Sequence, residues 1–358
     1  MTKNYFCLII SFLSAFCFAQ EKTVPFNSPF ITYEGRIQFK ADAAVLTWPG
    51  NSATIQFKGT EISARLKDLD TANYYNVIVD NQVIGRIHTD TLKHSYVLAS
   101  GLSKGKHILQ LFKRTEWDKG KTLFYGFEIP KNVKLLPPPA PKKRKIEFYG
   151  NSITCGYAME DHSGKDSWFG YYENNYLSYA AITARHFNAQ YYCNSKSGIG
   201  ILISWFPLVM REMYDRLDPV DSTSKWDFTK YTPDIVVINL FQNDSWLVNQ
   251  PERAEFKKNF GVKAPDENQI IAAYRNFVAS IRSKYPQASI ICALGSMDAT
   301  RNGSPWPGYI SKAVEQLHDS KIFTHFFPYK NTSGHPNVAE QKVMADSLID
   351  FIEKNIKW

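Results

Sequence analysis

The chain has 358 residues, which exceeds one average domain and suits two. Hydrophobic residues make up 44% and charged residues 21%, as in an ordinary globular protein. The formal net charge is +8, but the lysines are scattered, and the one basic cluster at residues 142–145 has no basic aromatic motif beside it, so we do not expect a nucleic-acid partner.

The first 19 residues have the pattern of a signal peptide. Lys3 precedes an apolar run, residues 6–18, that is too short to span a bilayer. The small residue Ala19 predicts cleavage between Ala19 and Gln20. We therefore expect a secreted or periplasmic protein, and no other segment is apolar enough to form a membrane span.

The cysteines do not suggest disulfide bonds. A lipid anchor at Cys17 is disfavoured because Phe16, which precedes it, is not small. Cleavage would leave an odd number of widely spaced cysteines in apolar runs, and we expect them to be free, buried thiols: Cys155, Cys193 and Cys292.

Residues 25–135 predict an all-β domain. Short segments such as 53–57 and 75–79 alternate apolar and polar residues, and turn signals such as Pro49-Gly50-Asn51 separate them. No ten-residue stretch has a convincing helical period. Many short strands at this spacing indicate a β-sandwich or jelly roll.

A linker and a different kind of domain follow. Residues 136–144 are rich in proline and lysine, which indicates a short, stiff spacer. In residues 145–358 strands alternate with helices, which predicts a three-layer αβα domain with a parallel sheet. The expected strands are 145–148, 190–193, 234–240, 289–294 and 322–326, and the expected helices are 171–187, 268–284 and 336–354.

Candidate functional residues follow the strands, because ligands of such sheets bind at the carboxyl ends of strands. Ser152 follows the first strand and is either a nucleophile or a helix N-cap. Gly198 lies in a glycine-containing loop that could bring backbone N–H groups to a ligand. Asn243 is a potential oxyanion donor or a turn residue. His335 precedes the last helix and is either a base or an exposed loop residue.

In this order and at these strand ends, the four residues resemble the SGNH hydrolase pattern. Longer segments are similar to carbohydrate esterase family 2, and the likeness covers nearly all of the chain after the signal peptide. In the second domain these segments are residues 147–157, 176–181 with 184–185, 226–228 and 233–240, and in the β domain they are residues 33–36, 113–116 and 126–127.

The resemblance implies a serine esterase that removes acetyl groups from acetylated polysaccharide or oligosaccharide without cofactor or metal. Ser152 would be the nucleophile and His335 the general base. The N–H groups of Ser152 and Gly198, with the Asn243 side chain, would form the oxyanion hole. Chemistry agrees, because a serine hydroxyl needs an imidazole to take its proton and each oxyanion donor contributes about 3 kcal/mol. The sequence also has no His-Glu-x-x-His motif or paired Cys/His cluster for a metal.

One departure from the pattern concerns the catalytic acid. Many SGNH enzymes carry an aspartate three residues before the histidine, where this chain has Thr332. No acidic residue lies between Asp319 and Glu340. We therefore expect a Ser152–His335 dyad in which a backbone carbonyl orients the imidazole.

A second departure concerns the substrate pocket. Phe241 stands where the family has glycine, and Gln242 follows it, so both are expected to shape the substrate site. An aromatic residue that the family often has before the histidine is replaced by Gly334. Trp246 is either a sugar-stacking platform or a packed aromatic residue at the start of a helix.

Two other functions fit parts of this pattern. Phe241 and Thr332 would suit a non-catalytic carbohydrate-binding protein on a decayed esterase scaffold, although Ser152, Asn243 and His335 are all present. A lipase or thioesterase of SGNH type is disfavoured by the β domain and by the lack of an apolar lid segment.

Overall fold

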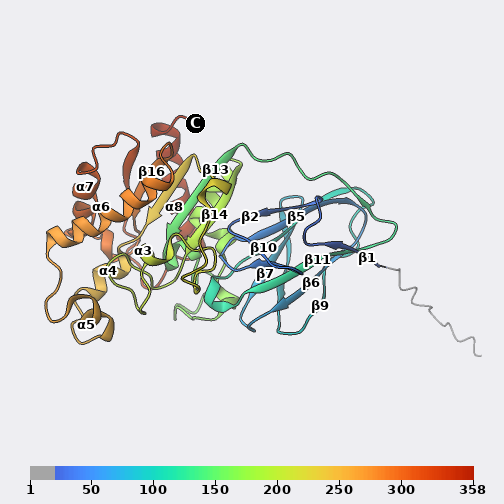
Figure 1. The fold of residues 1–358 in the computed structure, drawn as a ribbon, viewed down its shortest axis with the longest axis horizontal. Helices are drawn as coiled ribbons and strands as arrows, with labels where there is room; N and C mark the ends of the chain where they lie inside the picture. Colours follow the sequence, from blue (N-terminus) through green and yellow to red (C-terminus); the bar gives the residue numbers. More distant parts are fainter. Residues whose placement is uncertain (1–20) are drawn as a thin grey trace, which may run out of the picture.

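The computed structural model describes residues 21–358, so the expected signal peptide lies outside the described residues. An antiparallel β-sandwich is followed by a parallel α/β domain, and a long connection passes along the outside of the sandwich between them (Figure 1). This confirms the predicted fold class. No helix in the described part of the chain is long and apolar enough to cross a membrane.

The sandwich consists of two six-stranded antiparallel sheets. Its core is formed by inward-facing residues of both sheets, among them Ile55, Leu66, Leu109 and Phe124, all fully buried. One sheet has the order β3-β4-β11-β6-β9, with β1 beside β11: β1 (Glu21–Pro25), β3 (Gln38–Phe39), β4 (Ala44–Leu46), β6 (Ile62–Asp68), β9 (His94–Ala99) and β11 (Thr122–Pro130). The other has the order β12-β5-β10-β7-β8, with β2 beside β5: β2 (Ile31–Glu34), β5 (Ser52–Lys58), β7 (Tyr74–Val79), β8 (Gln82–His88), β10 (Lys106–Lys113) and β12 (Lys134–Leu135).

The second domain is built on a five-stranded parallel sheet with the order β14-β13-β15-β16-β17. The chain reverses its direction of winding between β13 and β15, and such a switch point opens a crevice at the carboxyl ends of the strands. The strands are β13 (Arg144–Gly150), β14 (Ala189–Ser195), β15 (Ile235–Asn239), β16 (Ser289–Leu294) and β17 (Ile322–Phe326).

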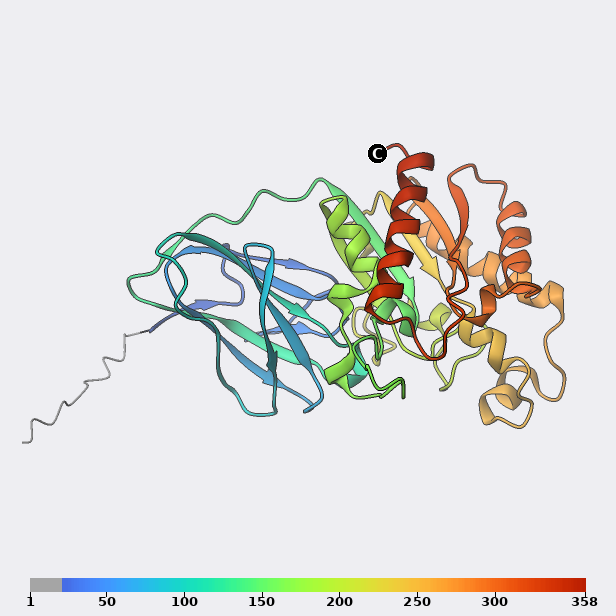
Figure 2. The ribbon, with the colours of Figure 1, turned by 180° about the vertical axis from the view of Figure 1, so that it is seen from behind.

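Helices cover both faces of this sheet, as Figures 1 and 2 show from opposite sides. Helices α6 and α7 pack on one face, and α2 and α8 pack on the other. The helices are α1 (Ser152–Cys155), α2 (Tyr179–His186), α3 (Met210–Met213), α4 (Gln242–Leu247), α5 (Ala254–Phe260), α6 (Glu267–Lys284), α7 (Trp306–Glu315) and α8 (Val338–Asn355).

The expected helix over residues 171–187 is only partly right. Its second half is α2, whereas the first half consists of two single 3-10 turns, η2 (Gly170–Tyr172) and η3 (Asn175–Leu177). Ser178 interrupts the pattern, because its side chain accepts a hydrogen bond from the N–H of Ala181 and caps the start of α2.

Buried polar contacts join the two domains. The Arg36 guanidinium of the sandwich donates to Glu147 Oε1 at 3.0 Å and to the Tyr149 hydroxyl at 2.8 Å, both on β13. Trp48 of the sandwich belongs to the hydrophobic core of the α/β domain, and its indole N–H donates to the carbonyl of Leu217 at 2.8 Å. These contacts hold the sandwich in a fixed position against the sheet that carries the candidate site.

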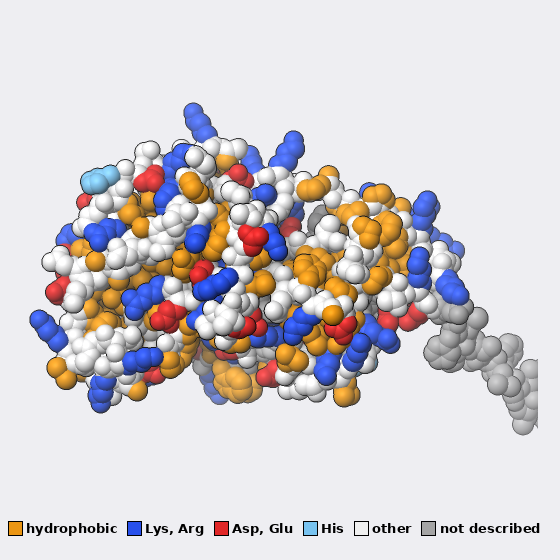
Figure 3. Space-filling view, viewed as in Figure 1, with side chains coloured by type: hydrophobic (Ala, Val, Ile, Leu, Met, Phe, Trp, Pro, Cys, Tyr) orange, Lys and Arg blue, Asp and Glu red, His pale blue; other side chains and the backbone are white. Residues whose placement is uncertain are grey.

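Charges of both signs are interspersed over the face drawn in Figure 3.

The free cysteines are buried, as predicted: Cys155, Cys193 and Cys292. Burial raises the pKa of each of these thiols, which keeps them in the unreactive protonated form.

Candidate active site

Ser152 lies where β13 turns into α1. Gly150 is required at this turn, because a Cβ there would lie 2.0 Å from Thr154 Oγ1. The cap of α1 is Asn151, whose side chain accepts from the N–H of Ile153 at 3.0 Å. Ser152 is therefore not the cap, and its hydroxyl is available for another partner.

That partner is His335. Its Nε2 lies 2.8 Å from Ser152 Oγ. His335 is held just before α8, whose N-cap Asn337 exchanges hydrogen bonds with Glu340 in a capping box. The switch-point crevice thus brings together two residues that are 183 positions apart in the sequence.

The other ring nitrogen of His335 contacts an acid, so the expected dyad without a carboxylate is wrong. Nδ1 lies 2.6 Å from Asp166 Oδ2, and the same carboxylate accepts from the backbone N–H of His335 at 2.9 Å. Because a carboxylate can only accept, Nδ1 carries the proton, and Nε2 of the neutral ring is free to accept the Ser152 proton.

The sequence does not indicate Asp166 as the acid, because Asp166 lies on a different loop from the one that precedes His335. It follows α1, and this loop folds back against the segment before α8. Thr332, at the position where the family has its aspartate, instead contacts Glu340 and Lys330. Partial burial raises the pKa of Asp166, but its hydrogen bonds to His335 and its coulombic interaction with that residue outweigh burial, so the pKa is lowered from the ordinary value of 3.8.

The glycine-containing loop after β14 lies against Asn243. Asn243 Nδ2 donates to the carbonyl of Ile199 at 2.8 Å, and its Oδ1 accepts from the indole of Trp205 at 3.0 Å. One N–H of the Asn243 amide remains for a ligand. Gly198 has φ +80°, which a residue with a side chain rarely adopts, and Trp205 and Phe206 lie beside it.

Two buried carboxylates fix the rest of this loop. Asp244 accepts from the N–H groups of three successive residues, Ile201, Leu202 and Ile203. Burial nevertheless raises the pKa of Asp244 to about 6. From the sandwich, Glu116 Oε2 accepts from the N–H of Ser197 at 2.7 Å and from Lys196 Nζ at 3.2 Å.

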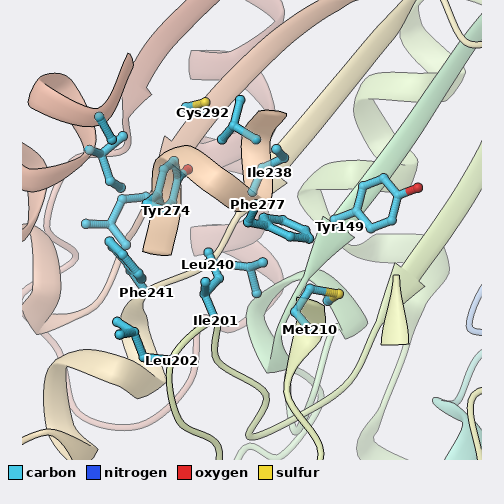
Figure 4. Close-up of a cluster of buried hydrophobic side chains, with 14 of the residues drawn as sticks. Tyr149, Ile201, Leu202, Met210, Ile238, Leu240, Phe241, Tyr274, Phe277 and Cys292 are labelled. Atoms are coloured by element: carbon cyan, nitrogen blue, oxygen red, sulfur yellow. The ribbon is translucent and has the colours of Figure 1, made fainter. Parts of the chain in front are cut away.

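Neither Phe241 nor Gln242 faces a substrate pocket, so their expected role there is wrong. Phe241 is fully buried in the hydrophobic core, where its ring packs against Tyr274 (Figure 4). It also packs against the ring of Trp306. Its φ is +88°, which explains why glycine suits this position. The Gln242 amide is also buried and bonds to Asp298 and to the N–H of Ala299.

Trp246 is partly buried beside a hollow of about 240 Å³. Its indole N–H donates to Asp298 Oδ2 at 2.7 Å, which fixes the ring at the wall of the hollow. A contact of Trp246 with sugar remains a prediction. Within residues 21–358, no group of three or more histidine, cysteine or acidic side chains could hold a metal ion.

This geometry is that of a serine hydrolase with a Ser-His-Asp arrangement at the switch point of a parallel sheet. Residues 33–139 match the family model of the carbohydrate esterase 2 N-terminal domain, and residues 148–333 match the GDSL-like lipase/acylhydrolase family. The chain belongs to carbohydrate esterase family 2.

Two curated relatives align with almost the whole chain. The cellulase/esterase CelE of Acetivibrio thermocellus is 34% identical over 93% of this chain, which spans only 40% of the length of that protein. An acetylxylan esterase/glucomannan deacetylase of Cellvibrio japonicus is 24% identical, and the alignment covers 94% of this chain and 92% of the relative.

Solved structures support the same family. A family two carbohydrate esterase from Clostridium thermocellum, in complex with cellohexaose, is 34% identical with a TM-score of 0.80, covering 90% of this chain and 98% of the other. A family two esterase from Cellvibrio japonicus has a TM-score of 0.82 at 23% identity, covering 94% and 98%, and shares the fold.

Proposed function

We propose that the protein is a secreted esterase that removes acetyl groups from polysaccharide through a Ser152–His335–Asp166 triad. The observation that carries this proposal is the unbroken hydrogen-bonded chain from Ser152 Oγ through both ring nitrogens of His335 to the Asp166 carboxylate. In this mechanism His335 takes the Ser152 proton as Oγ attacks the ester carbonyl, and then gives it to the sugar oxygen as the bond between that oxygen and the carbonyl carbon breaks. Water hydrolyses the acetyl-enzyme by the same route in reverse.

The negative charge that develops on the carbonyl oxygen needs donors. We assign this role to the N–H groups of Ser152 and Gly198 and to the free N–H of the Asn243 amide. The contacts of Asn243 with Ile199 and Trp205 support this role, because a fixed amide loses little free energy to reorganisation during the reaction.

The choice of substrate rests on the relatives, which include an acetylxylan esterase/glucomannan deacetylase. The purified protein should release 4-nitrophenol from 4-nitrophenyl acetate and acetate from acetylated xylan or glucomannan. Binding of these glycans without any ester hydrolysis would instead favour the non-catalytic carbohydrate-binding protein. Preference for long acyl chains over acetyl would favour a lipase.

Replacing Asn243 by alanine is expected to lower kcat about 100-fold with little change in KM. The reason is that its hydrogen bond to the reacting oxygen strengthens only as that oxygen becomes negative. Steady-state kinetics on 4-nitrophenyl acetate measure both constants. A change confined to KM would show that Asn243 binds the ground state of the substrate.

Replacing Glu116 by glutamine is expected to lower kcat about tenfold at unchanged KM. Glutamine keeps the size of the side chain but loses the charge that pairs with Lys196, so the loop that carries Gly198 is held less firmly. Glu128→Gln is the matched control, since Glu128 is also a buried carboxylate of the sandwich, and its partners are Arg65 and Ser95 of the same sheet. Equal kcat values for a folded Glu116→Gln variant and the wild type would contradict a positioning role.

A further inference from the structure

Exposed aromatic side chains gather on the loop that carries Asp166. Trp168 is 62% exposed and Phe169 is 53% exposed. Their rings stack, with centroids 4.9 Å apart and 27° between the planes. We call these two residues the aromatic platform. Single exposed apolar residues are ordinary, but neighbouring exposed rings beside a hollow indicate a binding surface.

The aromatic platform is held in place by the sandwich. Gly170 directly follows Phe169, and its backbone lies so close to the sandwich that a Cβ on Gly170 would be 2.1 Å from the carbonyl oxygen of Ala72. The Arg86 guanidinium lies 3.7 Å from the centroid of the Tyr171 ring. Between loop and sandwich is a hollow of about 300 Å³, lined by Thr71, Ala72, Tyr74 and residues 168–172. A surface fixed in this way loses little entropy when it binds a ligand.

The aromatic platform adjoins the candidate catalytic residues. Asp166 precedes Trp168 by two positions and holds His335. Lys119 Nζ lies 5.7 Å from the Trp168 ring and 6.0 Å from the Tyr157 ring, and the Tyr157 and His335 rings are 4.8 Å apart. Trp168 and Tyr157 thus lie near the same ammonium group, and Tyr157 packs beside His335, so the aromatic platform lies close to the candidate catalytic residues.

We propose that the aromatic platform is a glycan subsite, where it binds a pyranose ring of the same chain whose acetyl group is at Ser152. This inference rests on the proposed function. One face of a pyranose presents C–H groups that pack on an aromatic ring, while its hydroxyls remain at the edge.

Trp168→Ala and Trp168→Phe test this subsite. We expect the alanine variant to lose about tenfold more kcat/KM on acetylated glucomannan than on 4-nitrophenyl acetate, mainly through KM, because the small ester does not extend to the aromatic platform. The phenylalanine variant should retain most of the polymer activity. Phe39→Ala is the matched control, since Phe39 is 57% exposed on β3, in the sandwich.

Equal losses on both substrates would overturn the inference, since they would show that Trp168 only supports Asp166. Unchanged activity on both would overturn it as well. If the wild-type protein hydrolyses no ester, the proposed function fails, and calorimetric titration with cellohexaose then tests the subsite separately. Weaker binding by Trp168→Ala than by wild type would support the subsite, and equal binding would refute it.

Discussion

Replacing Ser152 by alanine should abolish ester hydrolysis, with a loss in kcat of at least about 10⁴-fold and no loss of fold. Without Oγ no acetyl-enzyme can form, and only the oxyanion hole and substrate binding remain to accelerate attack by water. Release of 4-nitrophenol measures the activity, and circular dichroism measures the fold. A folded variant with more than trace activity would exclude Ser152 as the nucleophile.

The sandwich offers an instructive control for this experiment, because it contains a second Ser-His-Asp arrangement. Ser103 Oγ lies 3.1 Å from His107 Nε2, and His107 Nδ1 lies 2.7 Å from Asp80 Oδ2. However, Nε2 also lies 3.0 Å from the Ser103 carbonyl, to which it must donate, so it cannot accept the serine proton. The hydrogen bond to Asp80 raises the pKa of His107, in agreement with a ring that donates from both nitrogens. We expect Ser103→Ala to retain full activity.

Replacing Asp166 by asparagine should lower kcat by about 10³- to 10⁴-fold with a small change in KM. An amide can orient the His335 ring only in part, and it cannot stabilise the imidazolium that forms when Ser152 loses its proton. Thr332→Ala is the control at the position where the family has its aspartate. Because Thr332 contacts Glu340 and Lys330, we expect it to change kcat by less than tenfold. A greater loss for Thr332→Ala than for Asp166→Asn would contradict the triad.

The contribution of the Asp166–His335 interaction to the stability of the fold should depend on pH. The pKa of Asp166 is lowered in the folded protein, so its interaction with His335 stabilises the fold above the ordinary pKa of 3.8 and is lost as the pH falls through the lower, folded-state value. The stability difference between the wild type and Asp166→Asn, measured by urea unfolding, should therefore be smaller at pH 3 than at pH 6.

Local patterns in the sequence determined the two-domain fold, whereas the pairing of Ser152 with His335 was implied by the resemblance to the SGNH hydrolase pattern. Short alternating segments specify a half-buried β-sheet, and alternation of apolar strands with helices specifies a parallel one. Because parallel strands end at the same edge of their sheet, residues that follow different strands meet there. In the structure Ser152 and His335 meet at this edge, although the sequence separates them by 183 positions.

Only the tertiary structure showed which carboxylate contacts His335 and which side chains line the site. Asp166 lies on an irregular loop, and no periodicity in the sequence indicates that such a loop folds back onto the His335 segment. Phe241 was expected to be a pocket residue because it stands where the family has glycine, but the backbone at φ +88° directs its ring into the core. The role of Glu116 depends on how the sandwich docks, which is set by long-range contacts such as those of Arg36 with Glu147 and Tyr149. Local sequence specifies an element and the edge at which it ends, whereas side-chain direction in loops and between domains depends on packing against residues far away in the chain.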